Sequence, residues 1–493
     1  MKQLNTLIQF LSPLETHGEL SRQVAGIACD SRRCMKDDLF IAYTGAANDG
    51  HQYIQQVLDK GASVIVYENP QAYLPQYGDV TWIRVQDGRD ALAILADAYY
   101  DHPSRKLRLV GVTGTNGKTT TATLLYQLFR GLGYECGLIS TIANYVGSHR
   151  YETENTTPDP ISLNRLLDEM VCQGCEYAFM EVSSHALEQK RTASLHFTGG
   201  IFTNLTHDHL DYHKTFAEYI RCKKLFFDHL PESAFALTNA DDRNGRIVVQ
   251  NTAARVYEYA ARTPADFKVR VVEKSLEGSL LNIDHTEVWT RFIGTHNAYN
   301  LLAVYAAAKL LGADRDEILS GISALKAVAG RLEYVQGGNN LTAVIDYAHT
   351  PDALENVLKT LKDITGNAHP LICIFGCGGN RDKTKRPEMA AVAEKYADRI
   401  VITSDNPRFE DPQTIIQEIY VGLSAQGRSR CVCITDRKEA IQSTLLLAAE
   451  GSLILIAGKG HENYQIIQGV KYDFDDLALV KACLKVNDTV THS

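Results

Sequence analysis

The chain has 493 residues, too many for one hydrophobic core, and a usual size of ~150 residues per domain predicts about three domains. Its hydrophobic fraction of 45% and charged fraction of 22% are those of an ordinary globular protein, and a net charge of −9 argues against a nucleic-acid partner. No apolar run approaches the ~20 residues that a membrane span needs, and the N-terminal stretch makes a poor signal peptide. The 11 scattered cysteines are typical of reduced thiols, so we expect a soluble, cytoplasmic protein.

The first hundred residues predict a small α/β unit. Short apolar runs at 39–42 and 62–66 alternate with polar turns, and an alanine-rich helical stretch follows at 91–100. Pro103 stops that helix, and we place the first domain boundary there, at residues 1–103.

Residues 110–121, VGVTGTNGKTTT, predict a phosphate-binding loop between a buried strand and a helix. Glycines let backbone N–H groups close around phosphate oxygens, and the following helix directs its positive end at them. Lys118 would supply a cation to the outer phosphates and Thr119 a hydroxyl to Mg²⁺. The loop departs from the commonest spacing, because Val112 stands where that pattern has glycine. We predict that it binds ATP or a close relative through Gly114, Thr115, Asn116, Gly117, Lys118, Thr119 and Thr120.

The rest of the second segment alternates strands and helices. Strands are expected at 178–182 and 200–203 and a helix at 219–230, which predicts a mostly parallel sheet with helices on both faces. Glu181, at a strand end, is well placed for Mg²⁺. The stretch 204–213, dense in His and Asp, is either a ligand site or a polar surface loop. Lys223 and Lys224, taken alone, are most simply a solvated pair.

The third segment predicts a doubly wound domain, with strands at 342–345, 371–375, 399–403, 429–434 and 453–456. Its functional loops are expected at the carboxyl ends of the strands. Arg381, Arg408 and Glu462 lie in three such loops. Arginines can clamp a carboxylate in bidentate fashion and Glu462 can accept from an ammonium group, so a zwitterionic amino acid fits these loops better than a second nucleotide.

Arg331 lies near the junction of the second and third segments, where it could reach a γ-phosphate on domain closure. Amides such as Asn297, at the start of an alanine-rich helix, suit the edge of a purine.

Ten motifs carry a family resemblance across essentially the whole chain. They are TGTNGKTTT, ENTTPD, EVSSHAL, DHLDYH, HNxxN, GRLE, DYAHTPDAL, GCGGNRDKTKRP, DNPR and GKGHE. In this order they resemble the Mur ligases of peptidoglycan synthesis. The resemblance implies an ATP-dependent ligase that works as a monomer. It also implies a UDP-binding domain at 1–103, a central ATP-binding domain at 104–328 and a Rossmann-like amino-acid-binding domain at 329–493.

The resemblance also implies roles for individual residues. Lys118, Lys223, Glu181 and His209 would be catalytic; Lys223 would be carbamylated by CO₂ and would position Mg²⁺ together with Thr119, Glu181 and His209. Adenine and ribose would be held by Asn297, Arg331 and Asp346. The UDP-N-acetylmuramoyl dipeptide would contact Ser31, Arg32, Asn155, Thr156, Thr157, Ser183, Gln189 and Arg191. Ala46 stands where many relatives have His, which puts one uridine-side contact in doubt.

The fourth residue of DNPR bears on the substrate. Family members that add diaminopimelate carry Arg there, so the resemblance implies that Arg408 grips the distal carboxylate. Its partners would be Arg381, Asp405, Asn406, Pro407, Gly458 and Glu462. The expected reaction joins meso-diaminopimelate to the D-glutamate γ-carboxylate of UDP-N-acetylmuramoyl-L-Ala-D-Glu through an acyl phosphate. Use of the LL isomer or of lysine stays open, as do a folylpolyglutamate synthetase and a nucleotide-gated binding protein.

Overall fold

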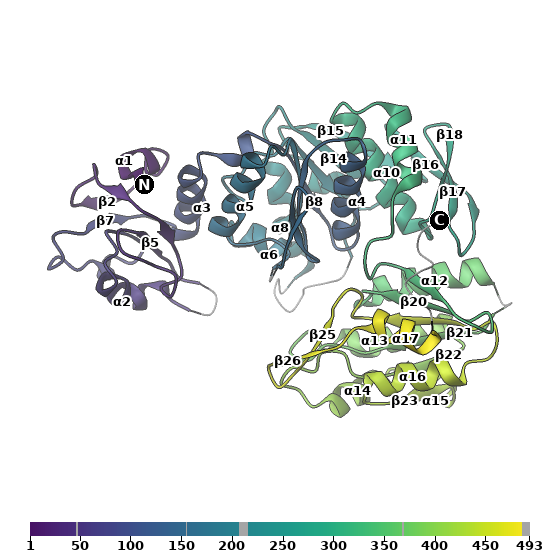
Figure 1. Ribbon diagram of the computed structural model, residues 1–493. Coiled ribbons are helices and arrows are strands. Elements are labelled where there is room, and N and C mark those ends of the chain that lie inside the picture. Colours follow the sequence, from purple (N-terminus) through teal and green to yellow (C-terminus); the bar gives the residue numbers. More distant parts are fainter. Residues whose placement is uncertain (46–47, 154, 207–214, 367–368, 486–493) are drawn as a thin grey trace.

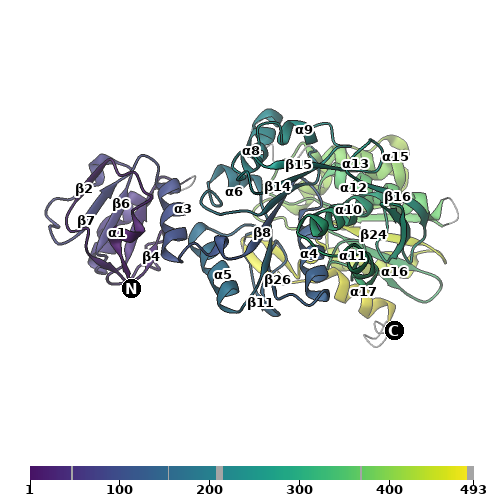
Figure 2. The same cartoon turned by 90° about the horizontal axis from the view of Figure 1, so that it is seen from above.

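The computed structural model describes residues 1–45, 48–153, 155–206, 215–366 and 369–485. It contains three α/β bodies in chain order, and the predicted fold class is confirmed. The first body lies at one end of the molecule, the second at the centre, and the third beside the second (Figures 1 and 2). Among these described residues, no helix is long and apolar enough to cross a membrane.

The first body is a five-stranded sheet in the order β2-β7-β6-β5-β4. Its strands are β2 (Glu15–His17), β4 (Ile27–Ala28), β5 (Leu39–Ala42), β6 (Val64–Tyr67) and β7 (Thr81–Arg84). Only β2 is antiparallel to its neighbour. Helix α2 (Ile54–Asp59) supplies residues to one core cluster and α3 (Gly88–Tyr99) to the other. Asp87 caps α3, because its side chain accepts the N–H groups of Arg89 and Asp90.

The second body is built on an 11-stranded sheet in which β8 (Arg108–Thr113) is the fifth strand. The order is β11-β10-β9-β12-β8-β13-β14-β15-β16-β17-β18. The seven neighbouring strands β9, β12, β8, β13, β14, β15 and β16 run parallel. Strands β10 and β11 at one edge and β17 and β18 at the other pair in antiparallel fashion. Their bounds are β9 (Cys136–Ile139), β10 (Asn144–Val146), β11 (His149–Tyr151), β12 (Tyr177–Glu181), β13 (Gly199–Phe202), β14 (Phe235–Asn239), β15 (Arg255–Ala260), β16 (Phe267–Lys274), β17 (Ser279–Ile283) and β18 (Thr286–Thr290).

Helices cover both faces of this sheet. One core cluster includes residues of α4 (Lys118–Gly131), α10 (Thr295–Leu310) and α11 (Arg315–Ala324). The other includes residues of α5 (Pro160–Cys172) and α8 (Phe216–Asp228). The short helices α6 (Ser184–Glu188) and α9 (Gly245–Val248) complete it. The antiparallel strands β17 and β18 form an extension that the sequence analysis did not anticipate.

The third body has a six-stranded sheet in the order β19-β20-β24-β21-β22-β23. All its pairs are parallel except β19 with β20. The strands are β19 (Glu333–Gln336), β20 (Thr342–Asp346), β21 (Leu371–Phe375), β22 (Arg399–Ile402), β23 (Cys431–Cys433) and β24 (Leu453–Ala457). The strand expected at 429–434 is shorter, because α15 (Ala425–Ser429) occupies its start.

Helices cover both faces of this sheet as well. Helices α12 (Pro351–Thr365), α13 (Lys385–Tyr396) and α14 (Pro412–Tyr420) contribute to one core cluster. Helices α16 (Arg437–Leu447) and α17 (Asp476–Leu484) contribute to the other. A hairpin of β25 (Tyr464–Ile467) and β26 (Val470–Asp473) follows the last core strand.

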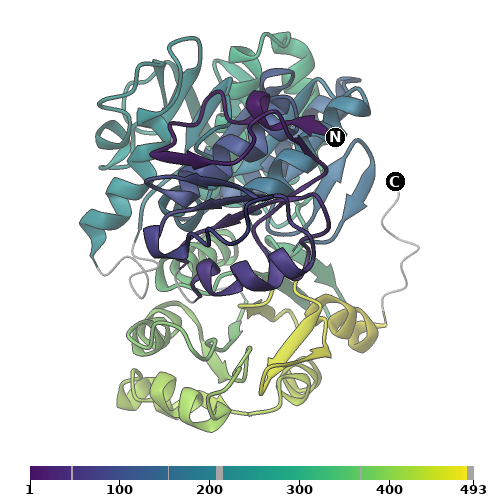
Figure 3. The same ribbon diagram turned by 90° about the vertical axis from the view of Figure 1, so that its left-hand side faces the viewer.

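The three bodies meet at two places. Helix α3 of the first body packs against α5 of the second. Figure 3 shows the molecule from the side of the first body, which lies in front, with the third body below. The second and third bodies face one another across the carboxyl ends of β8 and β20, where the functional loops begin (Figure 1).

Candidate active site

The phosphate loop lies between β8 and α4, and its glycines are needed where they stand. Gly114 has φ 150°, and a Cβ there would lie 1.9 Å from Thr203 Oγ1; Gly117 has φ 85°, and a Cβ there would lie 2.5 Å from Asn300 Oδ1. Lys118 donates from Nζ to the carbonyl oxygens of Gly114 and Thr115, at 2.9 and 2.8 Å. The lysine therefore lies folded over its own loop, in reach of a phosphate that would replace those carbonyls.

A buried oxygen cluster lies beside the loop. Thr119 Oγ1 donates to Glu181 Oε2 at 2.9 Å, and the other carboxylate oxygen accepts the Thr141 N–H at 2.7 Å. Both Thr119 and Glu181 are buried. A hydroxyl next to a carboxylate is a donor set that Mg²⁺ prefers, so these residues fit the metal. His209 lies outside the described residues.

Lys223 is the second cation at this corner. It is buried on α8, its Nζ donates to Gly114 O at 2.8 Å, and it lies 4.6 Å from the centre of the Tyr219 ring. Its neighbour Lys224 pairs with Asp228. The simple interpretation of the two lysines as a solvated pair is therefore wrong for Lys223, because helical spacing turns it into the protein and toward the phosphate loop.

A cavity of about 490 Å³ lies between the second and third bodies. Six residues predicted to bind ATP line it: Asn116, Gly117, Thr120, Asn297, Arg331 and Asp346. Asn116 Nδ2 donates to Asp352 Oδ2 of α12 at 2.9 Å, so the phosphate loop contacts the third body directly. The sequence analysis assigned no role to Asp352, although this residue stands in the DYAHTPDAL motif.

Arg331 lies at the junction as predicted by its place in the chain. Its guanidinium lies over the Tyr347 ring at 4.6 Å, and Nη2 donates to Thr119 Oγ1 at 3.4 Å. Its buried Nε has no hydrogen-bond partner among the described residues. An unpaired buried donor is costly, so this atom is suited to a ligand oxygen.

Asp346 and Asn297 are already engaged within the protein. The two Asp346 oxygens accept the N–H groups of Leu332 and Ala348, both at 2.8 Å. Burial raises the pKa of this carboxyl, and the nearby Arg331 opposes the shift. Asn297 donates from Nδ2 to Ile293 O at 2.9 Å. Both side chains shape the cavity wall, and their contact with adenine or ribose stays a prediction.

Most of the residues predicted for the dipeptide form one connected group in the second body. Thr157 Oγ1 donates to Glu181 O at 2.8 Å, and Arg191 donates to Thr157 O at 2.7 Å and to Gln189 Oε1. Ser183 lies against Thr157 and caps α6. Thr156 Oγ1 accepts from Thr141, and Asn155 lies nearby and is exposed.

Ser31 and Arg32 lie apart from this group, in the first body. Ser31 is buried, whereas the Arg32 guanidinium is exposed and pairs with Asp30 at 2.7 Å. Lys190, between Gln189 and Arg191 in the chain, links the two bodies. It pairs with Asp87 at 2.7 Å and with Asp90. Ala46 lies outside the described residues.

A second cavity, of about 390 Å³, lies at the strand ends of the third body. Its lining includes Arg381, Asp405, Asn406, Arg408, Gly458 and Glu462. These are six of the seven residues predicted for the amino acid; Pro407 is not in the lining. Thr156 and His185 of the second body also line it, so this cavity opens toward the predicted dipeptide site.

Glu462 is held from two sides in this cavity. Asn406 Nδ2 donates to Glu462 Oε2 at 2.8 Å, and the buried Lys459 donates to the same oxygen at 3.1 Å. Arg408 donates from Nη1 to Gly379 O at 2.8 Å, and burial together with the charge of Arg381 lowers its pKa. Sequence reasoning missed Lys459, although it stands in the GKGHE motif.

The fold and these two cavities define a class of protein: a three-body α/β enzyme with a phosphate loop that lines one cavity and a second, separately lined cavity at the strand ends of the third body. Three family models match the chain: "Mur ligase family, catalytic domain" at residues 23–100, "Mur ligase middle domain" at 112–308 and "Mur ligase, glutamate ligase domain" at 330–460. The chain belongs to the Mur ligase family.

Curated relatives resemble the chain over nearly its full length. UDP-N-acetylmuramoyl-L-alanyl-D-glutamate–2,6-diaminopimelate ligase of Phocaeicola vulgatus is 51% identical and covers 97% of this chain and 98% of its own. The enzyme of the same name from Geobacillus kaustophilus is 40% identical over 98% of this chain and 99% of its own.

Solved structures agree with this result. A structure of UDP-N-acetylmuramoyl-L-alanyl-D-glutamate–2,6-diaminopimelate ligase is 30% identical, with a TM-score of 0.70 over 100% of both chains. MurF ligase from Thermotoga maritima in complex with ADP is 18% identical, with a TM-score of 0.62 over 93% of this chain and 95% of its own, and shows the fold alone.

Proposed function

We propose that this chain is an ATP-dependent ligase that joins meso-2,6-diaminopimelate to the D-glutamate γ-carboxylate of UDP-N-acetylmuramoyl-L-Ala-D-Glu in peptidoglycan precursor synthesis. One observation carries the proposal: the cavity lined by Arg408, Arg381 and Glu462 also takes in Thr156 of the predicted dipeptide site. An amino acid bound there would face the carboxylate to which it is joined. The names of the curated relatives at 40 to 51% identity point the same way.

The reaction proceeds in two steps. A γ-carboxylate oxygen of the dipeptide attacks the γ-phosphorus of ATP, the bond from that phosphorus to the β–γ bridging oxygen breaks, and ADP leaves. The amine of diaminopimelate then attacks the acyl carbon, the carbon–oxygen bond to phosphate breaks, and the amine loses a proton. Carboxylate oxygen is a poor leaving group and phosphate is a good one, so the first step makes the second accessible.

Residues of the chain stabilise charge on the transferred phosphoryl group. Lys118 exchanges its contacts with Gly114 and Thr115 for phosphate oxygens. Arg331 offers its unpartnered Nε from the junction. Closure of the junction excludes water, which would otherwise hydrolyse the acyl phosphate.

Magnesium is part of the proposal, and Thr119 and Glu181, with His209, would hold it. When bound, it would neutralise charge on the phosphates. Lys223 fits the role of a carbamylated lysine, since its Nζ lies 2.8 Å from Gly114 O in the phosphate loop. A carbamate there would add an oxygen ligand to a corner that already holds the Thr119–Glu181 pair.

Diaminopimelate is favoured over lysine by the charges of the cavity. Lysine has no second carboxylate, so Arg408 and Arg381 would face an ammonium group or be left unpaired, whereas diaminopimelate supplies the missing anion. Glu462, between Asn406 and Lys459, accepts from the distal ammonium.

The proposal places the enzyme in the cytoplasm as a monomer. The cytoplasm is in keeping with its 11 free cysteines and with the supply of ATP there.

The test is amino-acid-dependent phosphate release from ATP in the presence of the UDP-dipeptide. Meso-diaminopimelate, LL-diaminopimelate and lysine are run in parallel, and the tripeptide product is identified by mass. We expect release to need both the UDP-dipeptide and diaminopimelate and to be fastest with the meso form. Equal turnover with lysine would contradict the substrate assignment. Release independent of either co-substrate would contradict ligase activity altogether.

A further inference from the structure

The segment that carries Arg408 has an unusual backbone conformation. Arg408 has φ 52°, in the left-handed region that residues with a Cβ seldom adopt, and Asn380 on the facing loop has the same value. Such conformations persist only where the surrounding contacts fix them. The contacts between these two loops therefore decide where the Arg408 guanidinium lies.

Hydrogen bonds join the two loops closely. Gly379 N donates to Asn406 O at 2.9 Å, and Phe409 N donates to Asn380 Oδ1 at 3.1 Å. The Arg408 guanidinium donates back to Gly379 O at 2.8 Å. Because this contact ends on a backbone carbonyl, the direction of the guanidinium depends on the position of the 379–380 segment.

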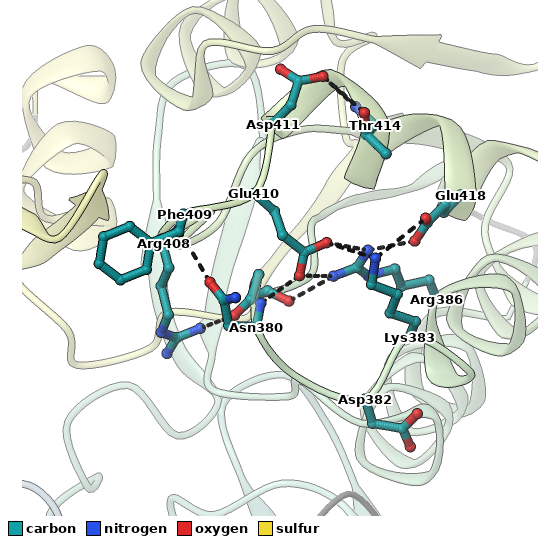
Figure 4. A network of polar contacts seen from close by, with 12 residues as sticks. Asn380, Asp382, Lys383, Arg386, Arg408, Phe409, Glu410, Asp411, Thr414 and Glu418 are labelled. Carbon is teal, nitrogen blue, oxygen red and sulfur yellow. Dashed lines mark hydrogen bonds and ion pairs between the residues drawn. The ribbon is translucent and has the colours of Figure 1, made fainter.

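Glu410 holds that segment from the other side. Its Oε1 accepts the Asn380 N–H, and both its oxygens accept from Arg386, each at 3.1 Å. Arg386 is fully buried on α13 and also donates to Glu418 of α14. Figure 4 shows Asn380 between Arg408 on one side and the Arg386–Glu410–Glu418 group on the other. The Arg386 contact lowers the pKa of Glu410 to about 2, so this carboxylate stays ionised at neutral pH.

We propose that Glu410, held by Arg386, is a positioning residue for amino-acid specificity. It fixes the 379–380 segment and thereby directs the Arg408 guanidinium toward the distal carboxylate of the substrate. This inference rests on the proposed function and adds to it, because Glu410 is not in the lining of the amino-acid cavity and acts through another residue.

The chain offers a matched control. Glu418 also accepts from Arg386, and it pairs with Lys383, but it makes no contact with Asn380 among the described residues. Glu410→Gln and Glu418→Gln each remove one negative charge from the same buried arginine. In Glu410→Gln an amide nitrogen replaces one of the two oxygens that accept from Arg386, which displaces the side chain that holds the Asn380 N–H. Glu418→Gln leaves that contact in place, so a general effect on packing would be common to both.

The experiment measures KM and kcat for diaminopimelate, ATP and the UDP-dipeptide in the wild type, in Glu410→Gln and in Glu418→Gln. We expect Glu410→Gln to raise KM for diaminopimelate about tenfold, with kcat and the other two KM values within about twofold, and Glu418→Gln to leave all of them within about twofold. Equal effects of the two variants on KM for diaminopimelate would overturn the positioning role.

A double-mutant cycle tests whether Glu410 acts through Arg408. Adding Glu410→Gln to Arg408→Ala should change kcat/KM for diaminopimelate less than about twofold, because the side chain that Glu410 positions is gone. Additive losses would contradict the proposal.

If Glu410→Gln folds poorly, Glu410→Asp is used. It keeps the charge opposite Arg386 and withdraws the oxygen from Asn380, so we expect the same rise in KM for diaminopimelate as for Glu410→Gln. KM does not depend on the amount of folded enzyme. The proposed function has its own test: a wild type without diaminopimelate-dependent phosphate release would refute it. The comparison of the variants tests only the positioning role of Glu410.

Discussion

The phosphate loop and the amino-acid cavity are built in different ways. The loop is one contiguous segment: Lys118 contacts carbonyls three and four residues away, although Thr203 and Asn300 from distant parts of the chain pack against its glycines. The cavity is held by contacts that are distant in sequence, such as Glu462 with Asn406 and Arg386 with Glu410. The proposed phosphate-binding part therefore centres on one contiguous motif, whereas the residues proposed to select the amino acid come from several loops.

The largest effect is expected at the loop. Lys118→Ala removes the cation that stabilises the transferred phosphoryl group, and we expect kcat to fall by about 10³-fold or more. We expect the variant to keep its fold, because the hydrogen bonds of Lys118 to the Gly114 and Thr115 carbonyls lie within the loop itself. Phosphate release and a thermal melt measure the two properties. A kcat within about tenfold of the wild type would show that the loop lysine is not part of the chemistry.

Lys223 tests whether the loop acts alone or with the adjacent helix. Lys223→Ala should lower kcat by about 10²-fold, and small carboxylates such as acetate should restore part of the activity if the lysine works as a carbamate. Lys224→Ala is the matched control, since this neighbour pairs with Asp228 on the same helix. Rescue is measured as kcat against acetate concentration. Full activity without acetate would refute the carbamate.

Arg408 tests the distributed side of the comparison. Arg408→Lys should lower the ratio of kcat/KM for diaminopimelate to that for lysine by about 10²-fold, because a bidentate partner of the distal carboxylate is lost. The ATPase half of the site should be untouched, so KM for ATP serves as the internal control. An unchanged ratio of the two amino acids would place specificity elsewhere in the cavity.

The smallest effect concerns acid stability of the cavity. Glu410 has its pKa lowered to about 2 by Arg386, so the stability that this pair contributes is present above the ordinary carboxyl pKa and is lost as pH falls toward 2. Glu410→Gln should remove about 1 kcal/mol at neutral pH and flatten the decline between pH 4.5 and 2, a window set by the ordinary and the lowered pKa of this carboxyl. Denaturant unfolding at several pH values measures this. Parallel curves for variant and wild type across that window would contradict the assignment.

Sequence reasoning succeeded where a motif is contiguous and failed where a role depends on packing. The phosphate loop and the strand-end loops follow from glycines, strand patterns and the order of elements. The burial of Lys223 is not marked by the Lys-Lys pair itself, although its helical spacing from the buried Tyr219 and Phe227 places it on the inward face of α8. Arg386 and Glu410 were missed because 24 residues separate them and nothing local marks their contact. The β17–β18 extension was missed although it carries hairpin signals, namely alternating burial along β17 and a two-residue turn at Asp284 and His285.

Lys190 links the predicted dipeptide site of the second body to the first body through exposed ion pairs. The side chains of Gln189 and Arg191 belong to the predicted dipeptide site, and the residue between them pairs with Asp87 and Asp90 of the first body. Because the Lys190 pair is 38% exposed, salt weakens it. The ion pairing between the first and second bodies at Lys190 is therefore expected to depend on ionic strength, whereas salt should weaken the contacts of the fully buried Arg386 beside the amino-acid cavity much less.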